Sequence, residues 1–192
     1  GLYYFLPSND GNSTSENIIL SDRLYNINAD EGLSSNDLYD IAVGKMGKIW
    51  VATDGGISIC SIEEGKKQIE RKDMTDGLPD NLIQQIETDK KGNLWIGTHD
   101  KGLCVYQFDK QQFHIPAIMQ DWTWGSVKSL EVLEEEIWIG TQQNGLIQYV
   151  LQANEYFRSY NRAQSYEFGA TNSVLADSEG NVWFTGNSNT LH

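Results

Sequence analysis

The chain has 192 residues, of which 39% are hydrophobic, and its 27 acidic and 14 basic side chains give a net charge of −13. This charge argues against nucleic acids and anionic membrane surfaces as partners, because binding to either requires a basic patch. No stretch approaches the ~18 consecutive apolar residues of a membrane-spanning helix, so the sequence predicts no membrane contact by this segment.

In chain order, residues 1–31 predict two strands. The segment GLYYF at Gly1–Phe5 resembles GLCVY at Gly102–Tyr106, and a second apolar run extends from Ile18 to Ile27. A polar loop rich in serine and asparagine, Pro7–Asn17, joins the two runs. We interpret these strands as the outer half of a divided repeating unit.

The next segments, residues 32–74, 75–121 and 122–165, are copies of one repeat, and residues 166–192 begin a fourth copy. Each copy has a tryptophan at the start of a β-prone strand, at intervals of 45, 43 and 45 residues. The strands read WVAT, WIGT, WIGT and WFTG and begin at Trp50, Trp95, Trp138 and Trp183. Turn residues between β-prone runs indicate consecutive antiparallel strands.

This repeat predicts an all-β fold. A period of about 40 to 50 residues with a tryptophan-centred strand is typical of a β-propeller with four-stranded antiparallel blades. The chain would hold about four blades, three whole and one divided between residues 1–31 and 166–192. Three arrangements would accommodate them: a four-bladed ring, an eight-bladed ring of two chains, or a segment of a larger propeller.

The repeated residues have structural explanations. Both faces of each sheet would pack on a neighbouring blade, so we expect the four tryptophans to fill the space between blades. Gly97 and Gly140, two residues after their tryptophans, suit a close approach between sheets. Cys60 and Cys104 are predicted to be free, buried thiols, because they fall on separate strands and a disulfide needs Cα atoms within ~7 Å.

The copies resemble the two-component regulator propeller repeat. The pattern of that family combines a GLSxN-type start, a D-x-x-G-x-hydrophobic-W turn and a W-hydrophobic-G-T strand that ends in GL. The second copy fits best, with Gly77, Leu78, Asn81, Asp89, Gly92, Leu94, Trp95, Gly97, Thr98, Gly102 and Leu103. The third copy lacks the Asp and Gly of the turn, and the fourth has Gly186 where threonine is usual.

The resemblance implies a sensor ectodomain of a hybrid two-component histidine kinase, in the periplasm and attached to the inner membrane. In this family, common in gut Bacteroidetes, two seven-bladed propellers typically precede a small β-sandwich, a membrane span and kinase modules inside the cell. The chain differs in its number of repeats and in lacking the sandwich, span and kinase. We therefore expect signalling by the whole receptor and no catalysis by this segment.

Function has to be inferred from a site, because the propeller fold hosts many activities. The usual site is the face where the loops converge on the axis. The residues predicted there are Asn36, Asp54, Asn81, His99, Trp122, Trp124, Gln142, Gln143, Asn172 and Asn187. Amide, imidazole and carboxylate groups can hydrogen-bond an oligosaccharide, and an aromatic ring can cover the apolar face of a sugar. The sequence therefore predicts a glycan-binding face.

Four of these residues have a competing structural explanation. Asn36 and Asn81 could cap turns through hydrogen bonds from side chain to backbone. Trp122 and Trp124 could belong to the core instead of forming a platform for a sugar ring.

Catalytic and metal sites find little support in the sequence. His99, His114 and His192 lie in unlike contexts without metal-binding spacing, and no GxSxG element is present. We expect neither a cofactor nor a metal.

Two alternative functions stay open. One is a propeller enzyme similar to the streptogramin lyases, which the fourth copy at Asp177–Thr185 also resembles. The other is a protein-binding scaffold. The preferred interpretation is a non-catalytic sensor that binds a glycan-derived ligand or supports dimerisation by self-association.

Overall fold

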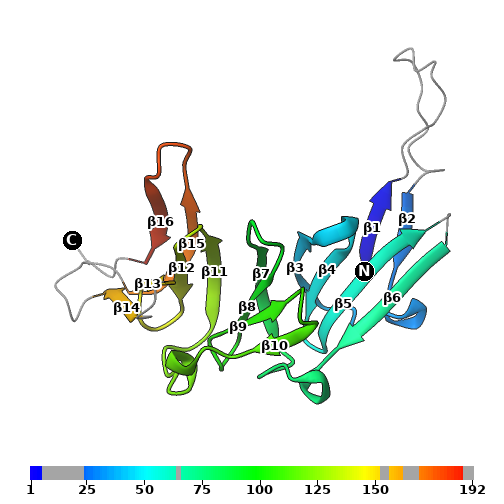
Figure 1. Cartoon of the computed structure of the whole chain (residues 1–192), viewed down its shortest axis with the longest axis horizontal. Coiled ribbons are helices and arrows are strands. Elements are labelled where there is room, and N and C mark those ends of the chain that lie inside the picture. The colour runs from blue at the N-terminus through cyan, green and yellow to red at the C-terminus, as the bar shows by residue number, and fades with distance from the viewer. Residues whose placement is uncertain (6–23, 64–65, 152–155, 162–168, 188–192) are drawn as a thin grey trace, which may run out of the picture.

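The computed structural model describes residues 1–5, 24–63, 66–151, 156–161 and 169–187 (Figure 1). In these ranges the regular structure is β-strand apart from short 3₁₀ helices. None of the helices described has the length and apolar character that a membrane span requires. The predicted loop Pro7–Asn17 lies outside the described residues.

Three sheets have four strands each, and every strand pairs antiparallel with the next strand along the chain. The first sheet contains β3 (Leu38–Val43), β4 (Ile49–Thr53), β5 (Gly56–Glu63) and β6 (Lys66–Lys72). The second contains β7 (Ile83–Thr88), β8 (Leu94–Thr98), β9 (Leu103–Gln107) and β10 (Gln112–His114). The third contains β11 (Val127–Val132), β12 (Glu136–Thr141), β13 (Leu146–Val150) and β14 (Tyr156–Tyr160). The predicted fold of four-stranded antiparallel blades is confirmed.

Two further sheets have two strands each in the described part of the chain. One pairs β1 (Leu2–Phe5) with β2 (Leu24–Ile27), and the other pairs β15 (Thr171–Ala176) with β16 (Val182–Gly186). Figure 1 shows these sheets at opposite ends of the row of sheets. The two halves that the sequence assigns to one divided blade are therefore not joined to each other within this chain.

The inner strands of successive sheets lie side by side. β3 contacts β7, β7 contacts β11, and β11 contacts β15. Each inner strand shifts its pairing by one residue near its start, which is the mark of a β-bulge. The residues at this shift are Tyr39, Gln84, Lys128 and Asn172. A 3₁₀ helix, η3 (Lys45–Gly47), joins β3 to β4 at the other end of the first sheet.

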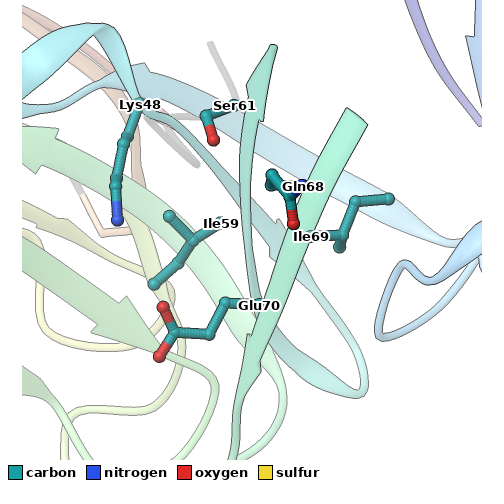
Figure 2. Close-up of a pocket in the computed structure, with 6 residues that line it drawn as sticks. All are labelled: Lys48, Ile59, Ser61, Gln68, Ile69 and Glu70. Carbon is teal, nitrogen blue, oxygen red and sulfur yellow. The ribbon is translucent and has the colours of Figure 1, made fainter. Parts of the chain in front are cut away.

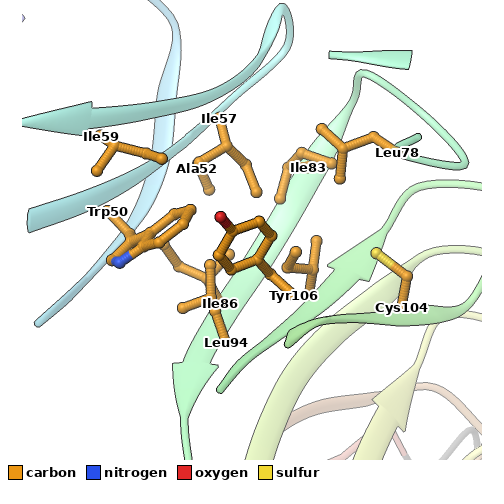
Figure 3. Packing of buried hydrophobic residues seen from close by; sticks show 11 residues of the cluster. Trp50, Ala52, Ile57, Ile59, Leu78, Ile83, Ile86, Leu94, Cys104 and Tyr106 are labelled. Carbon is orange, nitrogen blue, oxygen red and sulfur yellow. The ribbon is translucent and has the colours of Figure 1, made fainter. Parts of the chain in front are cut away.

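The hydrophobic core lies between successive sheets. Figure 3 shows Trp50 on the first sheet facing Tyr106 on the second, and their ring centroids are 5.1 Å apart. Trp95 and Tyr149 form the equivalent pair between the second and third sheets, with centroids 6.2 Å apart. All four rings are buried. Burial of one large apolar side chain contributes roughly 1.5–3 kcal/mol, so each pair is a main element of its interface.

The prediction that every tryptophan fills the space between blades is wrong for the other two. Trp138 is half-buried and stacks on Tyr160 of its own sheet, with centroids 5.7 Å apart. Trp183 is 63% exposed. In the two buried pairs, the partner ring belongs to the third strand of the next sheet. The sheet that follows Trp138 has only the strands β15 and β16 in the described part of the chain, and no sheet is described after Trp183. Neither tryptophan therefore has a described third strand to pack against.

The expected close approach of the glycines is confirmed. A Cβ atom at Gly97 would lie 2.5 Å from Cγ1 of Val127, on the inner strand of the next sheet. A Cβ atom at Gly140 would lie 2.9 Å from the carbonyl oxygen of Thr171 on the following inner strand. Cys60 and Cys104 are free and buried, also as predicted. Burial raises the pKa of Cys60 to about 11 and raises the pKa of Cys104 further.

Candidate functional site

One end of the sheets carries two kinds of loop, which together we call the loop face. The strands of each sheet are lettered A to D in chain order, from the inner strand to the outer strand. The D–A loops lead from the outer strand of one sheet into the inner strand of the next and contain η2 (Ala29–Glu31), η4 (Met74–Asp76) and η5 (Ala117–Met119). The B–C turns join the second and third strands of a sheet, which are β4 and β5, β8 and β9, and β12 and β13. Backbone hydrogen bonds tie the two kinds of loop together, from His99 to Leu82 at 3.0 Å and from Gln142 to Ser126 at 2.9 Å.

A buried threonine closes each complete B–C turn. The hydroxyls donate to the carbonyl of a glycine at 2.8 to 3.0 Å, in the pairs Thr53–Gly56, Thr98–Gly102 and Thr141–Gly145. Each hydroxyl also accepts a backbone N–H from within its turn, donated by Gly55, Lys101 and Asn144. The threonines are 0% exposed. The ends of the turns are therefore fixed by hydrogen bonds that use none of the side chains between them.

Asn36 and Asn81 cap 3₁₀ helices. Oδ1 of Asn36 accepts the backbone N–H of Ala29, the first residue of η2, at 2.9 Å. Oδ1 of Asn81 accepts the N–H of Met74, the first residue of η4, at 2.9 Å. Both amides thus satisfy a donor that a helix start leaves without an intrahelical partner. The contacts favour the structural explanation for these two residues.

The D–A loop of the second sheet is ordered further by a carboxylate. Asp73 accepts hydrogen bonds from the hydroxyl and the backbone N–H of Thr75, which lower the pKa of the Asp73 carboxyl. Asp76 in turn accepts the N–H of Asp73 at 3.0 Å, which completes a capping box. The loop is therefore held by hydrogen bonds to its own side chains.

Four of the predicted residues present polar groups on the B–C turns. Asp54 is exposed on the first turn, and Gln142 and Gln143 are exposed on the third. His99, on the second turn, has a side chain that is 43% exposed, and its Nδ1 lies 3.0 Å from Oδ1 of Asp100. These residues lie on the turns of three different sheets, with Gln142 and Gln143 on the same turn, and no hydrogen bond or ion pair is described between any two of the four side chains.

The structure does bring Asn172 and Asn187 together. Nδ2 of Asn172 donates to Oδ1 of Asn187 at 3.3 Å, and both side chains are exposed. The backbone N–H of Asn187 also donates to the carbonyl of Ala170 at 3.0 Å. The pair sits at the start of β15 and just after β16, at the loop face of the last sheet.

Trp122 and Trp124 pack against the core instead of forming an open platform. Their rings contact each other with centroids 4.8 Å apart, and Trp124 contacts Phe157 at 5.0 Å. Both are half-buried against the core between the second and third sheets. Nε1 of Trp122 donates to the carbonyl of Gly125 at 2.8 Å, which fixes the ring.

Two carboxylates on inner strands escaped the sequence-based prediction. Asp40 accepts the backbone N–H of Ile86 at 2.8 Å, and Glu87 accepts that of Val132 at 2.9 Å. Burial raises the pKa of Asp40. Burial, and secondarily the nearby charge of Glu131, raises the pKa of Glu87 to about 7. The bonds join neighbouring sheets, and only the register between sheets would have revealed them.

The structure also has a small polar cavity on the first sheet, shown in Figure 2. Its volume is about 220 Å³, and it is lined by Lys48, Ile59, Ser61, Gln68, Ile69 and Glu70. Glu70 forms an ion pair with Lys72 at 2.8 Å. The volume is below the roughly 300 Å³ of a typical small-molecule site, and none of the ten predicted residues lines this cavity. The loop face is therefore the better candidate.

Within the described ranges, no three His, Cys, Asp or Glu side chains are grouped so as to hold a metal ion.

Comparison with solved structures supports the propeller fold. The extracellular domain of a hybrid two-component system of B. thetaiotaomicron, BT3049, matches 88% of this chain with 24% identity and a TM-score of 0.66. The extracellular domain of a second system of that organism, BT4673, described as one-component, matches 84% with 20% identity and a TM-score of 0.64. The chain spans 22% and 20% of the length of these two domains.

A streptogramin B lyase is also similar, with 19% identity and a TM-score of 0.57 over 82% of this chain and 51% of the lyase. A sequence comparison with the curated proteins found no match. Residues 77–100 match the sequence model of the family described as two component regulator propeller. They include all the residues of the second copy that carry the resemblance found in the sequence except Gly102 and Leu103. The chain is therefore a propeller-fold protein that carries a two-component regulator propeller repeat.

Proposed function

We propose that this chain is a non-catalytic part of the sensor propeller of a two-component signalling receptor, and that it lies in the periplasm. Its role would be to bind a glycan-derived ligand at the loop face or to support receptor dimerisation. The observation that carries the proposal is the match of residues 77–100 to the regulator propeller repeat. The extracellular location of the two similar domains supports the placement outside the cytoplasm.

The loop face is suited to binding a polyhydroxylated ligand. Its frame is fixed by buried threonine hydroxyls and by capped 3₁₀ helices, while His99, Gln142 and Gln143 present polar groups that the frame does not use. A binding surface that is already ordered loses less conformational entropy when a ligand binds. Hydrogen bonds from several loops could then add up to a useful affinity.

Titration calorimetry of the chain with a panel of oligosaccharides tests the proposal. We expect His99→Ala and Gln142→Ala each to weaken the binding of a sugar hit about 5- to 10-fold, the effect of losing one hydrogen bond. Gln112→Ala, an exposed change on the outer strand β10, is the matched control and should leave binding unchanged. Mass analysis of the sugar after incubation should find it intact, and conversion to a product would overturn the non-catalytic role.

The structural similarity to streptogramin B lyase supports one second candidate, a propeller enzyme of that kind. Incubation of the chain with a streptogramin B antibiotic, followed by mass spectrometry, separates the two candidates. Conversion of the antibiotic to a product would favour the enzyme. An unchanged antibiotic together with a bound, unchanged sugar would favour the sensor.

A further inference from the structure

The third B–C turn contains a reactive dipeptide. Asn144 is the one asparagine of the sequence that is followed directly by a glycine. The side chain of an asparagine in such a pair can lose its amide group spontaneously, because the backbone nitrogen of the next residue can attack the side-chain carbonyl and close a succinimide ring. Glycine hinders this attack least, since it has no Cβ atom.

The attacking nitrogen is available in this turn. The ends of the turn are fixed, because Thr141 donates its hydroxyl and its backbone N–H to the carbonyl of Gly145 at 2.9 and 3.0 Å. The N–H of Asn144 in turn donates to Oγ1 of Thr141 at 3.0 Å. In the ranges that the structure covers, no hydrogen bond from the backbone N–H of Gly145 is described. Attack by this nitrogen therefore does not require it to leave a hydrogen-bond partner.

A hydrogen bond from Asn161 restrains the side chain that is attacked. Nδ2 of Asn161 donates to Oδ1 of Asn144 at 2.7 Å and to the backbone carbonyl oxygen of Asn144 at 3.4 Å. Both oxygens of Asn144 thus lie toward the same donor. The nitrogen of Gly145 is bonded to the other side of that carbonyl carbon, so the Asn144 side chain has to turn away from Asn161 before ring closure. Asn161 is 8% exposed and directly follows β14.

We propose that Asn144 is a site of spontaneous deamidation in the folded protein, and that the hydrogen bond from Asn161 limits the rate. The nitrogen of Gly145 gives up its proton to hydroxide and bonds to Cγ of Asn144, and the side-chain nitrogen takes up a proton and leaves as ammonia. Water then opens the succinimide at one of its two carbonyls. One opening gives aspartate, and the other gives isoaspartate, in which the main chain runs through Cγ.

The products would change one turn of the loop face. Either product adds a negative charge beside the neutral side chains of Gln142 and Gln143. Aspartate keeps an oxygen that can accept the hydrogen bond from Asn161. Isoaspartate lengthens the main chain between Thr141 and Gly145, so it should disturb the bonds that close the turn. The proposal does not depend on ligand binding at the loop face.

Mass spectrometry of the incubated chain gives the first test. The folded chain is held in mildly alkaline buffer, and samples are digested and analysed over time. We expect the amide of Asn144 to convert to a mixture of aspartate and isoaspartate, faster at higher pH because the nitrogen of Gly145 must lose its proton. Asn172 and Asn187, which are each followed by serine, are internal controls and should stay intact over the same period. Circular dichroism checks that the chain remains folded.

Variants of Asn161 test the restraint. Asn161→Ala and Asn161→Leu both remove the donor, and Asn161→Leu keeps a similar side-chain volume, so one can serve if the other fails to fold. In a variant that urea unfolding shows to be folded, Asn144 should deamidate about 5-fold faster, the effect of losing one hydrogen bond. Asn144→Gln is the matched control. It keeps a carboxamide on the turn but would have to close a larger ring, so its amide should remain intact.

Three results would overturn the proposal. One is an intact Asn144 in the folded parent at a time when the urea-unfolded chain has lost the amide. Another is a rate in the folded Asn161 variants that equals or falls below that of the parent. The third is a product that contains aspartate without isoaspartate, which would exclude the attack by Gly145.

Discussion

Glu87 accepts a hydrogen bond from the backbone N–H of Val132, 2.9 Å away on the inner strand of the next sheet. Asp40 does the same for Ile86 at 2.8 Å, one sheet earlier. Each inner strand is at the edge of its sheet, so these N–H groups have no strand partner on the open side. The two carboxylates therefore connect three consecutive sheets, because they accept backbone N–H groups that have no partner within their own sheets.

The connection through Glu87 should depend on pH. Because the folded protein raises the pKa of Glu87 from 4.5 to about 7, the folded state holds a proton that the unfolded state releases between these pH values. Stability therefore falls as pH rises from 4.5 to 7. The full shift corresponds to roughly 3 kcal/mol, and solvent screening of this half-buried group reduces the effect to about 1 kcal/mol.

Glu87→Gln keeps an oxygen that can accept the Val132 N–H but cannot ionise. We expect it to be about 1 kcal/mol more stable than the parent at pH 8 and equal to it near pH 4.5, by urea unfolding at both values. Glu179→Gln, at an exposed turn, is the control and should not change the pH profile. An equal effect of Glu87→Gln at both pH values would contradict the assignment.

The threonine hydroxyls should control the order of the B–C turns. Thr98→Val keeps the side-chain shape but removes the hydroxyl that bonds Gly102 and Lys101, at an expected cost of about 1–2 kcal/mol. In hydrogen exchange, the amide of Lys101 should lose protection in Thr98→Val and keep it in Thr98→Ser. Equal protection in the two variants would show that the hydroxyl does not hold the turn.

A side chain at Gly102 should destabilise the protein more than one at Gly180. Its φ is +67°, and a Cβ atom there would lie 2.6 Å from Cδ2 of Trp122. Gly180 has a similar φ of +85° with nothing within 4 Å, so Gly180→Ala reports the backbone strain alone, about 1–2 kcal/mol. Gly102→Ala should cost about 1–3 kcal/mol more in chemical unfolding, because the ring must move, and it should change the near-ultraviolet circular dichroism. Equal costs for the two variants would exclude the contact with Trp122.

The two thiols should differ in their order of reaction. Cys60 is 5% exposed and lines a mainly apolar groove of about 310 Å³ beside β1, whereas Cys104 is 0% exposed inside the core. Burial raises the pKa of both thiols, so both should react slowly at pH 8 with a thiolate-directed reagent such as Ellman's reagent. In dilute protein Cys60 should react first, and Cys104 only at the rate of unfolding. Labelling of Cys60→Ser as fast as the parent would contradict this order.

Much of the architecture could be predicted because it repeats. The spacing of Trp50, Trp95, Trp138 and Trp183 indicated the sheets, and the outcome for Trp50 and Trp95 matched the expected packing. Trp138 and Trp183 departed from it because their packing depends on a third strand in the next sheet, and no such strand is described after either tryptophan. The repeat determines which side chains lie on the surface of each sheet, and the position of the sheet in the row determines which of these side chains are buried.

The candidate site was less accessible to sequence analysis. Asn36 and Asn81 are polar residues at loop positions, and the same features that suggest ligand binding also suit helix capping. Only the hydrogen bonds to Ala29 and Met74 separate the two roles. Asp40 and Glu87 were missed for a different reason: their partners are backbone groups about 45 residues away, so no local pattern identifies them.

The threonine-closed turns have a consequence for how such a protein can change. Between Thr53 and Gly56 lie two residues, and between Thr98 and Gly102 or Thr141 and Gly145 lie three, with unrelated side chains in each turn. The closing bonds use only the threonine hydroxyl and backbone groups. Mutation can therefore exchange most of the intervening residues without removing the closing bonds. Asn144 is an exception, because its Oδ1 accepts a hydrogen bond from Nδ2 of the buried Asn161 at 2.7 Å. Apart from that position, the sequence of the loop face can vary while its frame stays constant.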